Sequence, residues 1–411
     1  MKSDPKGRSD PVRRSEPGGL PEKGVIPLTV PEISGREWEY LKDCLDTGWV
    51  SSVGSYVDRF EESCAEACGV RRAVAAVNGT AALHAALMAA GIGPDEEVLV
   101  SALTFIAPAN AVRYCGAWPV FIDAEPDFLQ MDPERLEEFL KEGCRQEGGT
   151  TINKATGRRV TGIIPVHILG HPVDLDPVLN LASEFGLALI EDASEGLGGL
   201  YRGRPMGSMG RAGTLSFNGN KLITSGGGGM VLTDDEALAE RVRYLTTQAK
   251  DDPKEYVHRE IGYNYRLTNI QAALGLAQME RLAEYVAAKK RIARRYQEAF
   301  SGLPGIEPMA RADWAGSTFW LYTVKLDGDS RPLMRYLEEQ DIQTRPLWQP
   351  LNQSPAQAGS PGTDCPVAEE LNRRCLSLPC SVGLSESDQD RVIRAVADFL
   401  GKESGLKEET D

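Results

Sequence analysis

The sequence predicts an α/β protein, in which helices cover both faces of a mainly parallel sheet and a smaller domain follows. Apolar stretches of strand length alternate with helix-length stretches between residues 72 and 190. The strand-length stretches are apolar on both faces, which is typical of a parallel sheet buried between helices. The chain has 411 residues. Because single hydrophobic cores stop growing at about 250–300 residues, a second domain is expected.

The amino-terminal part is expected to contain a tail followed by two helices. Residues 1–24 mix charged residues with proline and glycine and show no apolar periodicity, so we expect them to be disordered. Ser34 and Glu37 have the spacing of a capping box, which predicts a helix that ends near Gly48. A second helix is expected over residues 56–68.

The alternating part of the chain predicts five strands joined by helices through right-handed connections. The expected strands are 73–77, 97–100, 118–122, 162–166 and 187–190. The expected helices between them are 81–90, 108–115, 133–141 and 177–185. Polar residues 144–159 interrupt this pattern, and we expect a surface excursion or a hairpin there.

The remaining residues predict two further strands, a linking helix and the smaller domain. Apolar residues recur on one face from 269 to 300, which indicates one long helix. Mixed helix and strand patterns over 301–400 predict a small α+β unit, and residues 401–411 are expected to form a tail. The large domain is therefore expected to span residues 25–268. Its last two strands are 213–217 and 230–233.

Composition excludes several classes of partner and site. The formal net charge of −15 argues against binding to nucleic acid or to an anionic membrane, since both require a basic face. The eight cysteines form no CxxC pair and have no histidine at ligand spacing, so no metal site is expected. We find no signal peptide and no apolar run of about eighteen residues. A cytoplasmic location with reduced thiols is expected.

Lys221 lies on the connection between the last two expected strands of the large domain. Such connections carry chemistry more often than packing. A lysine amine can form a Schiff base with a carbonyl compound, and the run Gly226–Gly229 permits positive φ angles close to a ligand. An isolated lysine is more often a solvated surface residue, so this interpretation depends on the other residues that accompany it.

The first expected strand runs into Asn78-Gly79-Thr80-Ala81 at the start of a helix. In a doubly wound sheet, ligands bind at the carboxyl ends of the strands. Unpaired backbone amides, the positive end of the helix and the Thr80 hydroxyl together suit a phosphate group. The alternative is that Asn78 or Thr80 only caps the helix.

Two other strand ends carry residues suited to an aromatic, charged ligand. Asp192 follows a buried strand, where a carboxylate is costly unless it meets a cation such as a protonated ring nitrogen. A solvated loop carboxylate is the alternative. Phe105 follows another strand and suits stacking on a ring, although a core position is also open. An amine, a carboxylate, an aromatic face and a phosphate cradle together match pyridoxal 5′-phosphate.

With these features in place, the chain resembles the DegT/StrS-type sugar aminotransferases of the fold type I pyridoxal-phosphate enzymes, over residues 26–400. Four stretches carry the resemblance: 78–83 (NGTAAL), 192–195 (DASE), 216–221 (SFNGNK) and 262–273 (GYNYRLTNIQAA). The resemblance implies a large cofactor-binding domain with a mainly parallel seven-stranded sheet between helices, and a smaller carboxy-terminal α+β domain.

The resemblance also implies roles for individual residues. Lys221 is expected to carry the cofactor as an internal aldimine and to act as the base and acid of the proton shift. Asp192 is expected to bind the pyridine nitrogen, Phe105 to stack on the ring and Asn264 to reach the cofactor of the neighbouring subunit, so a homodimer with shared sites is expected. Glu195 stands where the family often has Gln or His against the phenolic oxygen. The expected phosphate ligands are Thr80, Ser216 and the backbone at Gly79 and Ala81.

The implied reaction is transamination. A branch of the family that performs dehydration has histidine at the position of Lys221, and this chain has the lysine. L-Glutamate is the expected amino donor and a nucleotide-linked keto sugar the expected acceptor. Four stretches resemble the branch that aminates UDP-4-keto-6-deoxy-N-acetylhexosamines: 48–57, the surroundings of 153–154, 226–229 and 343–348. The alternatives are a GDP-4-keto-6-deoxymannose aminotransferase of the perosamine type and a catalytically silent regulator that binds pyridoxal phosphate.

Two further interpretations concern an alternative enzyme class, the Rossmann oxidoreductases, and two of the histidines. A Rossmann oxidoreductase would also alternate strands and helices, but its GxGxxG fingerprint does not follow the first expected strand. His84 lies within an expected helix, where we expect it to be packed. His167 ends an expected strand and is retained as an additional candidate for the active site.

Overall fold

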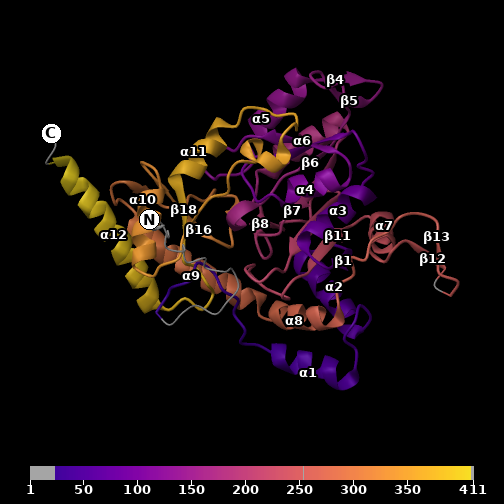
Figure 1. The fold of residues 1–411 in the computed structure, drawn as a ribbon, viewed down its shortest axis with the longest axis horizontal. Helices are drawn as coiled ribbons and strands as arrows, with labels where there is room; N and C mark the ends of the chain where they lie inside the picture. Colours follow the sequence, from indigo (N-terminus) through magenta and orange to yellow (C-terminus); the bar gives the residue numbers. More distant parts are fainter. Residues whose placement is uncertain (1–23, 253, 409–411) are drawn as a thin grey trace, which may run out of the picture.

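The computed structural model describes residues 24–252 and 254–408, and a seven-stranded sheet forms its centre (Figure 1). The strands lie in the order β1-β11-β10-β7-β6-β2-β3, and within this sheet only β11 runs antiparallel to its neighbours. The predicted mainly parallel sheet is confirmed. Its strands are β1 (Arg72–Ala76), β2 (Glu97–Ser101), β3 (Trp118–Ile122), β6 (Val160–Ile164), β7 (Ala188–Asp192), β10 (Ala212–Ser216) and β11 (Gly229–Thr233).

Helices cover both faces of this sheet because its strands carry apolar side chains on both sides. On β2, Val98 and Val100 belong to one hydrophobic core and Leu99 to another. Removing such side chains from water is the dominant favourable term in folding. The helices of the large domain that pack on or beside the sheet are α2 (Ser55–Cys68), α3 (Gly79–Ala89), α4 (Ala107–Tyr114), α5 (Pro133–Glu138), α6 (Leu175–Phe185) and α7 (Glu236–Thr246).

Helix α8 (Asn269–Met279) packs against α2 through a glycine. A Cβ atom on Gly275 would lie 2.6 Å from Cζ of Phe60, a side chain that is fully buried. The Phe60 ring in turn contacts the Phe217 ring at a centroid distance of 4.8 Å. The absence of a side chain at 275 therefore lets α8 hold Phe60 against the segment that follows β10.

A four-stranded antiparallel sheet in the order β14-β16-β18-β17 forms the centre of the smaller domain. The segment near the amino terminus joins this domain, since Ile26 pairs with Ile342 and the amide of Cys380 donates to the carbonyl of Leu28. The expected boundary at residue 25 places this segment with the large domain. The elements are α9 (Leu282–Phe300), β14 (Ile306–Glu307), β16 (Tyr322–Leu326), α10 (Arg331–Glu339), β17 (Arg345–Pro346), α11 (Pro366–Arg374), β18 (Cys375–Leu378) and α12 (Glu386–Glu408).

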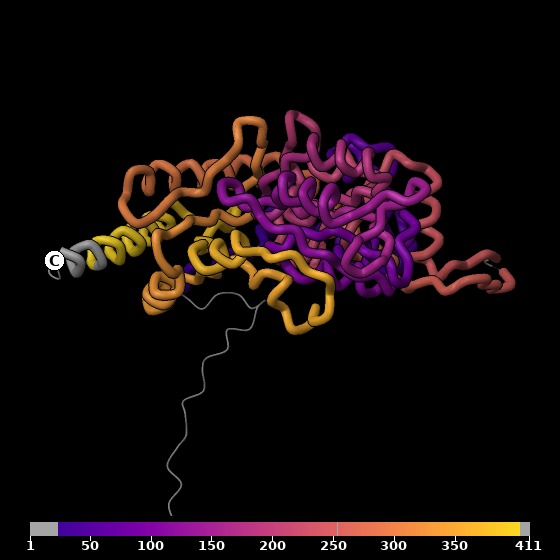
Figure 2. Tube along the Cα trace, turned by 90° about the horizontal axis from the view of Figure 1, so that it is seen from above, coloured from indigo at the N-terminus to yellow at the C-terminus, as the bar shows by residue number. Residues whose placement is uncertain are grey.

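The remaining elements are short and lie at the edges of the two domains. Residues 144–159, where a surface excursion or a hairpin was expected, contain a hairpin. These elements are α1 (Glu37–Thr47), β4 (Cys144–Glu147), β5 (Thr150–Asn153), β8 (Leu200–Tyr201), β9 (Arg204–Pro205), β12 (Lys250–Asp252), β13 (Val257–His258) and β15 (Ala315–Gly316). Figures 1 and 2 show the β12–β13 hairpin projecting from one end of the molecule and α12 at the opposite end.

Three local expectations differ from the structure. The helix predicted over 269–300 is two helices, α8 and α9, and the pattern does not reveal the break because both helices place apolar residues against the core. Ser34 forms no capping box, since its hydroxyl accepts from Arg281 and α1 starts three residues later. Helix α12 continues through residue 408 into the predicted tail. The tail predicted over 1–24 lies outside the described residues except for Gly24.

Hydropathy along the helices and the state of the cysteines complete the description. None of the helices in the described part of the chain is both long and apolar enough to cross a membrane. All eight cysteines are buried with free thiols, in agreement with the reduced thiols expected from the sequence. Burial raises the pKa of the Cys64 thiol well above its ordinary value.

We predict that Gly275→Ala lowers the thermal midpoint of unfolding. The added methyl group overlaps the Phe60 ring, and overpacking of this kind costs about 1–3 kcal/mol, which offsets the roughly 1 kcal/mol that alanine gains in a helix. Gly401→Ala is the matched control, because that helical glycine in α12 has no atom within 4 Å of the added Cβ position. Differential scanning calorimetry of both variants checks this. A Gly275→Ala protein as stable as the control would contradict the close contact.

Candidate functional site

The predicted site residues gather around a cavity of about 400 Å³ at the carboxyl ends of the central strands. Asp192 is the last residue of β7 and Ser216 the last of β10. Two tryptophans from residues 301–400, Trp320 and Trp348, complete the wall. The predicted residues that line the cavity are Gly79, Thr80, Phe105, Asp192, Glu195, Ser216 and Lys221.

The start of α3 touches the end of β10 at a position that only glycine can occupy. A Cβ atom on Gly79 would lie 2.7 Å from Cβ of Ser216. Thr80 and Ser216 both line the cavity, and among the described residues their hydroxyls have no hydrogen-bond partner, so both can bind an anion. The positive end of α3 adds to this preference for negative charge.

Ala81 does not take part in the cradle in the predicted way. Its amide donates to Oδ1 of Asn78 at 2.8 Å, so the side chain of Asn78 caps α3. Ala81 is also absent from the cavity wall. In the described structure the amides of Gly79 and Thr80 have no acceptor, and these two are the backbone donors available to a phosphate.

The Gly226–Gly229 run contains the positive φ angles that its sequence predicts. Gly226 and Gly228 have φ angles of 75° and 109°, in the region that favours glycine. Gly227 and Gly228 line the cavity. A Cβ atom on Gly229 would lie 2.5 Å from the carbonyl carbon of Asn78, so this glycine allows β11 to pass beside the start of α3.

Asp192 presents a carboxylate that is largely free for a ligand. Its exposed fraction is 5%, and the only hydrogen bond that its carboxylate accepts within the described part of the chain comes from the Ser194 amide at 3.0 Å. A buried carboxylate with one weak partner favours a cation beside it. The protonated nitrogen of a pyridine ring is a cation of the right kind.

Lys221 lies between a carboxylate and an aromatic ring. Its Nζ atom is 3.1 Å from Oε1 of Glu195 and 4.1 Å from the centre of the Trp320 ring. Glu195 also accepts a hydrogen bond from the Leu169 amide at 2.8 Å. Burial raises the pKa of Glu195, and the neighbouring Lys221 and the Leu169 amide oppose this rise.

Glu191, next to Asp192 on β7, supports the site from the opposite side of the strand. Its fully buried carboxylate accepts from the amides of Gly207, Met209 and Gly210 at 2.6–2.8 Å and contacts Nε2 of His167 at 3.0 Å. Burial alone raises its pKa, but these partners hold the pKa of Glu191 below its ordinary value.

His84 and His167 have structural roles. His167 does not line the cavity, so the structure does not support its candidacy as an active-site residue; it holds the strand that carries Asp192. His84 lies beside the rings of Tyr114, Tyr263 and Tyr265, as expected for a packed residue. Burial lowers the pKa of His84.

Two predicted residues are exposed. Phe105 lines the cavity but has 58% of its surface in contact with solvent. Asn264 is exposed and lies outside the cavity of its own chain, beside Thr247. Sequence analysis missed Trp320 because it belongs to an apolar strand-like run whose pattern suits a core residue equally well. It missed Glu191 because the partners of that carboxylate lie 16 or more residues away in the sequence.

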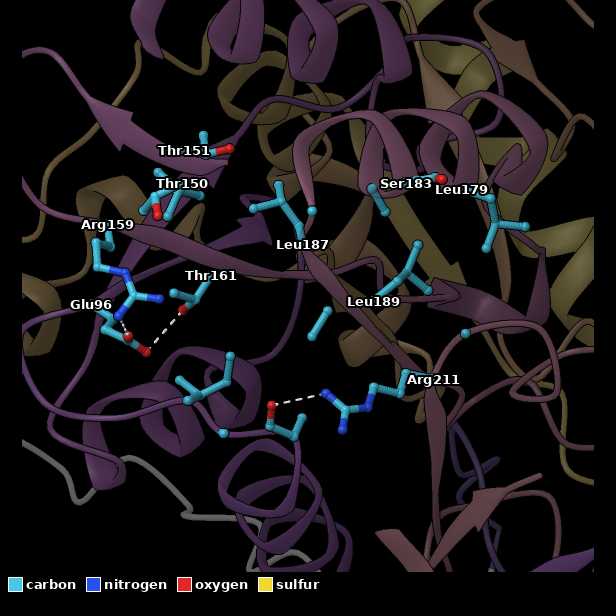
Figure 3. Close-up of a pocket in the computed structure, with 18 of the residues that line it drawn as sticks. Glu96, Thr150, Thr151, Arg159, Thr161, Leu179, Ser183, Leu187, Leu189 and Arg211 are labelled. Atoms are coloured by element: carbon cyan, nitrogen blue, oxygen red, sulfur yellow. Dashed lines mark hydrogen bonds and ion pairs between the residues drawn. The ribbon is translucent and has the colours of Figure 1, made fainter. Parts of the chain in front are cut away.

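A second cavity of about 480 Å³ lies at the opposite, amino-terminal edge of the sheet (Figure 3). Its charged groups pair among themselves or with the backbone. Glu96 is 3.3 Å from Arg159 and accepts from Thr161, and Arg211 donates to the carbonyl of Ala90. None of the predicted site residues lines this cavity. We therefore place the site at the carboxyl edge, where doubly wound sheets bind their ligands.

Comparison with known proteins agrees with this geometry. The model of the DegT/DnrJ/EryC1/StrS aminotransferase family matches residues 31–397. A GDP-perosamine synthase of Caulobacter vibrioides is 40% identical over 380 residues, which cover 91% of this chain and 98% of the relative. The protein EpsN of Bacillus subtilis, named a putative pyridoxal phosphate-dependent aminotransferase, is 39% identical, with coverage of 90% and 95%.

A solved structure shows the same arrangement of elements. The crystal structure of a DegT/DnrJ/EryC1/StrS aminotransferase from Brucella abortus superimposes with a TM-score of 0.82 at 32% identity, covering 89% of this chain and 95% of that one. The predictions of fold type I, of aminotransferase activity and of pyridoxal 5′-phosphate as cofactor are confirmed. The chain belongs to the DegT/DnrJ/EryC1/StrS aminotransferase family.

Proposed function

We propose that this chain transfers the amino group of L-glutamate to the C4 ketone of a nucleotide-linked 4-keto-6-deoxy sugar, with Lys221 as the residue that anchors the cofactor. The observation that carries the proposal is the meeting of Lys221, Asp192, Thr80 and Ser216 on a single cavity. These residues come from three separate segments of the chain, 78–83, 192–195 and 216–221.

The residues of the cavity fit pyridoxal 5′-phosphate at both of its ends. The contact between Gly79 and Ser216 leaves two free hydroxyls and two free amides for a phosphate. Asp192 offers a carboxylate for the ring nitrogen. When bound, this cofactor supplies an electron sink that stabilises negative charge on the carbon next to the reacting nitrogen.

The proton transfers fall to Lys221. It contributes the only amine to the cavity wall among the described residues, so Nζ is the atom that takes a proton from the substrate carbon and returns it. Glu195 holds this amine at 3.1 Å. With the cofactor bound, Glu195 would contact the phenolic oxygen of its ring.

The comparison favours a GDP-linked over a UDP-linked substrate. The sequence-based expectation was a UDP-linked N-acetylhexosamine, whereas the Caulobacter relative at 40% identity is a GDP-perosamine synthase. The hairpin around Asn153 and Lys154, one of the stretches behind that expectation, contributes Gly149, Thr150 and Thr151 to the wall of the amino-edge cavity and no residue to the cavity that contains Lys221. We therefore propose GDP-4-keto-6-deoxymannose as the acceptor.

A homodimer with shared sites is part of the proposal. Large apolar side chains are exposed on α1 and on the β12–β13 hairpin, including Trp38 at 78% and Tyr256 at 68%. Apolar groups exposed in this number favour a second copy as partner. Asn264, which follows the hairpin, is free to enter a neighbouring site because it does not line its own.

We predict that Lys221→Ala reduces multiple-turnover transamination by at least about a thousandfold, because the variant lacks both the anchor and the general base. Amino transfer from glutamate is measured by product formation, and absorbance reports bound pyridoxal phosphate. Lys290→Ala, at an exposed position on α9, is the control. Retained turnover in Lys221→Ala would refute the assignment.

We predict a preference for GDP-linked substrates of at least about tenfold in kcat/KM, since a few pocket contacts set discrimination of this size. The enzyme is incubated with glutamate and either GDP- or UDP-linked 4-keto-6-deoxy sugars, and the products are identified by mass spectrometry. A preference for the UDP sugars would restore the sequence-based expectation. Bound cofactor without amination of any sugar in the panel would favour the silent regulator.

We predict that mixing Lys221→Ala and Asn264→Ala subunits restores activity that neither variant has alone. In a mixed dimer with shared sites, one site combines an intact Lys221 with an intact Asn264, and the other has neither. Activity is assayed after the two variants are unfolded and refolded together, and each variant refolded by itself is the control. If every site used only its own Asn264, mixing would restore nothing.

A further inference from the structure

We propose that Trp320 is a positioning residue, which uses its ring face to hold the amine of Lys221 in the orientation required for covalent capture of the cofactor. For capture, the Lys221 ammonium would give a proton to the Glu195 carboxylate 3.1 Å away, and the neutral amine would form the carbon–nitrogen bond while the aldehyde oxygen leaves as water. The inference rests on the proposed role of Lys221 as the anchor. Nζ of Lys221 lies 4.1 Å from the centre of the indole ring. Cations within about 6 Å of a ring centre are attracted to its face, and Trp provides the strongest attraction.

The Trp320 ring is fixed relative to the lysine by a hydrogen bond to the neighbouring residue. Its indole N–H donates to the carbonyl oxygen of Asn220 at 2.8 Å. Asn220, which binds the Trp320 ring, directly precedes Lys221, which carries the amine. Trp320 is also 3% exposed, so packing restricts its rotation. A fixed ring and a fixed carboxylate on Glu195 together restrict a lysine side chain that is otherwise flexible.

A buried lysine holds the backbone of Trp320 in place. Lys289 on α9 is 2% exposed, and its Nζ donates to the carbonyls of Trp320 and Cys380 at 2.8 Å and 2.5 Å. No carboxylate neutralises Lys289 within the described part of the chain. A buried amine is costly unless it makes strong hydrogen bonds, so placing it here ties α9 and the segment that follows β18 to residue 320.

The residue before Trp320 adopts a backbone conformation that is unfavourable for its type. Phe319 has a φ angle of 53°, in the left-handed region that costs energy for a side chain of this size. The Thr318 amide donates to the carbonyl of Gly170, and the Phe319 amide donates to Oγ of Ser317. These bonds hold the turn that directs Trp320 into the cavity.

The experiment compares Trp320→Leu with Trp320→Phe. Apo protein is mixed with pyridoxal 5′-phosphate, the covalent product is trapped with borohydride at successive times, and peptide mass spectrometry locates the modified lysine. We expect Trp320→Leu, which removes the ring face, to slow capture on Lys221 about tenfold, because small errors in position reduce such rates strongly. Trp320→Phe keeps a ring and is expected to recover most of the rate.

Trp118→Phe and Trp118→Leu are the matched controls. The Trp118 ring lies 3.7 Å beneath the guanidinium of Arg113 at the start of β3, on the amino edge of the sheet, and it does not line the cavity. Both control variants are expected to capture the cofactor at the wild-type rate. If Trp320→Leu does not yield folded protein, Trp320→Met takes its place, because methionine preserves an apolar side chain without a ring.

The outcomes separate this inference from the proposed function. Modification of a lysine other than Lys221 in the wild-type protein would overturn the anchor assignment itself. Modification at Lys221 with equal rates in wild type and Trp320→Leu would overturn only the role of Trp320. Equal loss in the Phe and Leu variants would also overturn it, since a ring face would then have no specific effect.

Discussion

The close approach of helix α3 to strands β10 and β11 is the constraint on which the rest of the site depends. Glycines at 79 and 229 allow it, and a Cβ atom at either position would collide with Ser216 or with the backbone of Asn78. The approach brings a helix amino terminus, a serine hydroxyl and the loop that carries Lys221 to one point. Without it, the anion-binding donors and the amine would lie around separate depressions, and no single ligand could reach both.

Two adjacent carboxylates on β7 have different roles: Glu191 stabilises the structure around the site, and Asp192 lines the cavity. Successive side chains of a strand point to opposite faces, so Glu191 and Asp192 enter different environments. Glu191 is fully paired with His167 and with backbone amides, which makes it a rigid brace. Asp192 keeps most of its hydrogen-bonding capacity for a ligand. A brace with three backbone donors fixes the position of its neighbour more firmly than packing alone would.

Local sequence predicted the sheet, and it predicted most of the residues that line the cavity, because both are encoded by contiguous patterns. Five apolar runs marked parallel strands, and the residues at or just after the ends of β1, β7 and β10 marked the cavity. Features that depend on contacts with residues far away in the sequence could not be predicted. Arg281 donates a hydrogen bond to the hydroxyl of Ser34, which would otherwise cap the helix. The break between α8 and α9 leaves the apolar pattern unchanged. The amide of Ala81 is not available to a phosphate because it donates to the side chain of Asn78. Trp320 lies about a hundred residues from the lysine that it contacts.

The smaller domain has a structural part in the chemistry of the larger one. The expected boundary assigns the amine to residues 25–268 and Trp320 to residues 301–400, yet the ring lies against the amine and its N–H binds the carbonyl beside it. Any shift of the small sheet relative to the large one would move the ring from the amine while leaving Glu195 in place. Because Lys289 binds both Trp320 and Cys380, such a shift would carry α9, β16 and β18 together as one body. The geometry of Lys221 therefore depends on how the two domains are docked, and the large domain alone would not reproduce it.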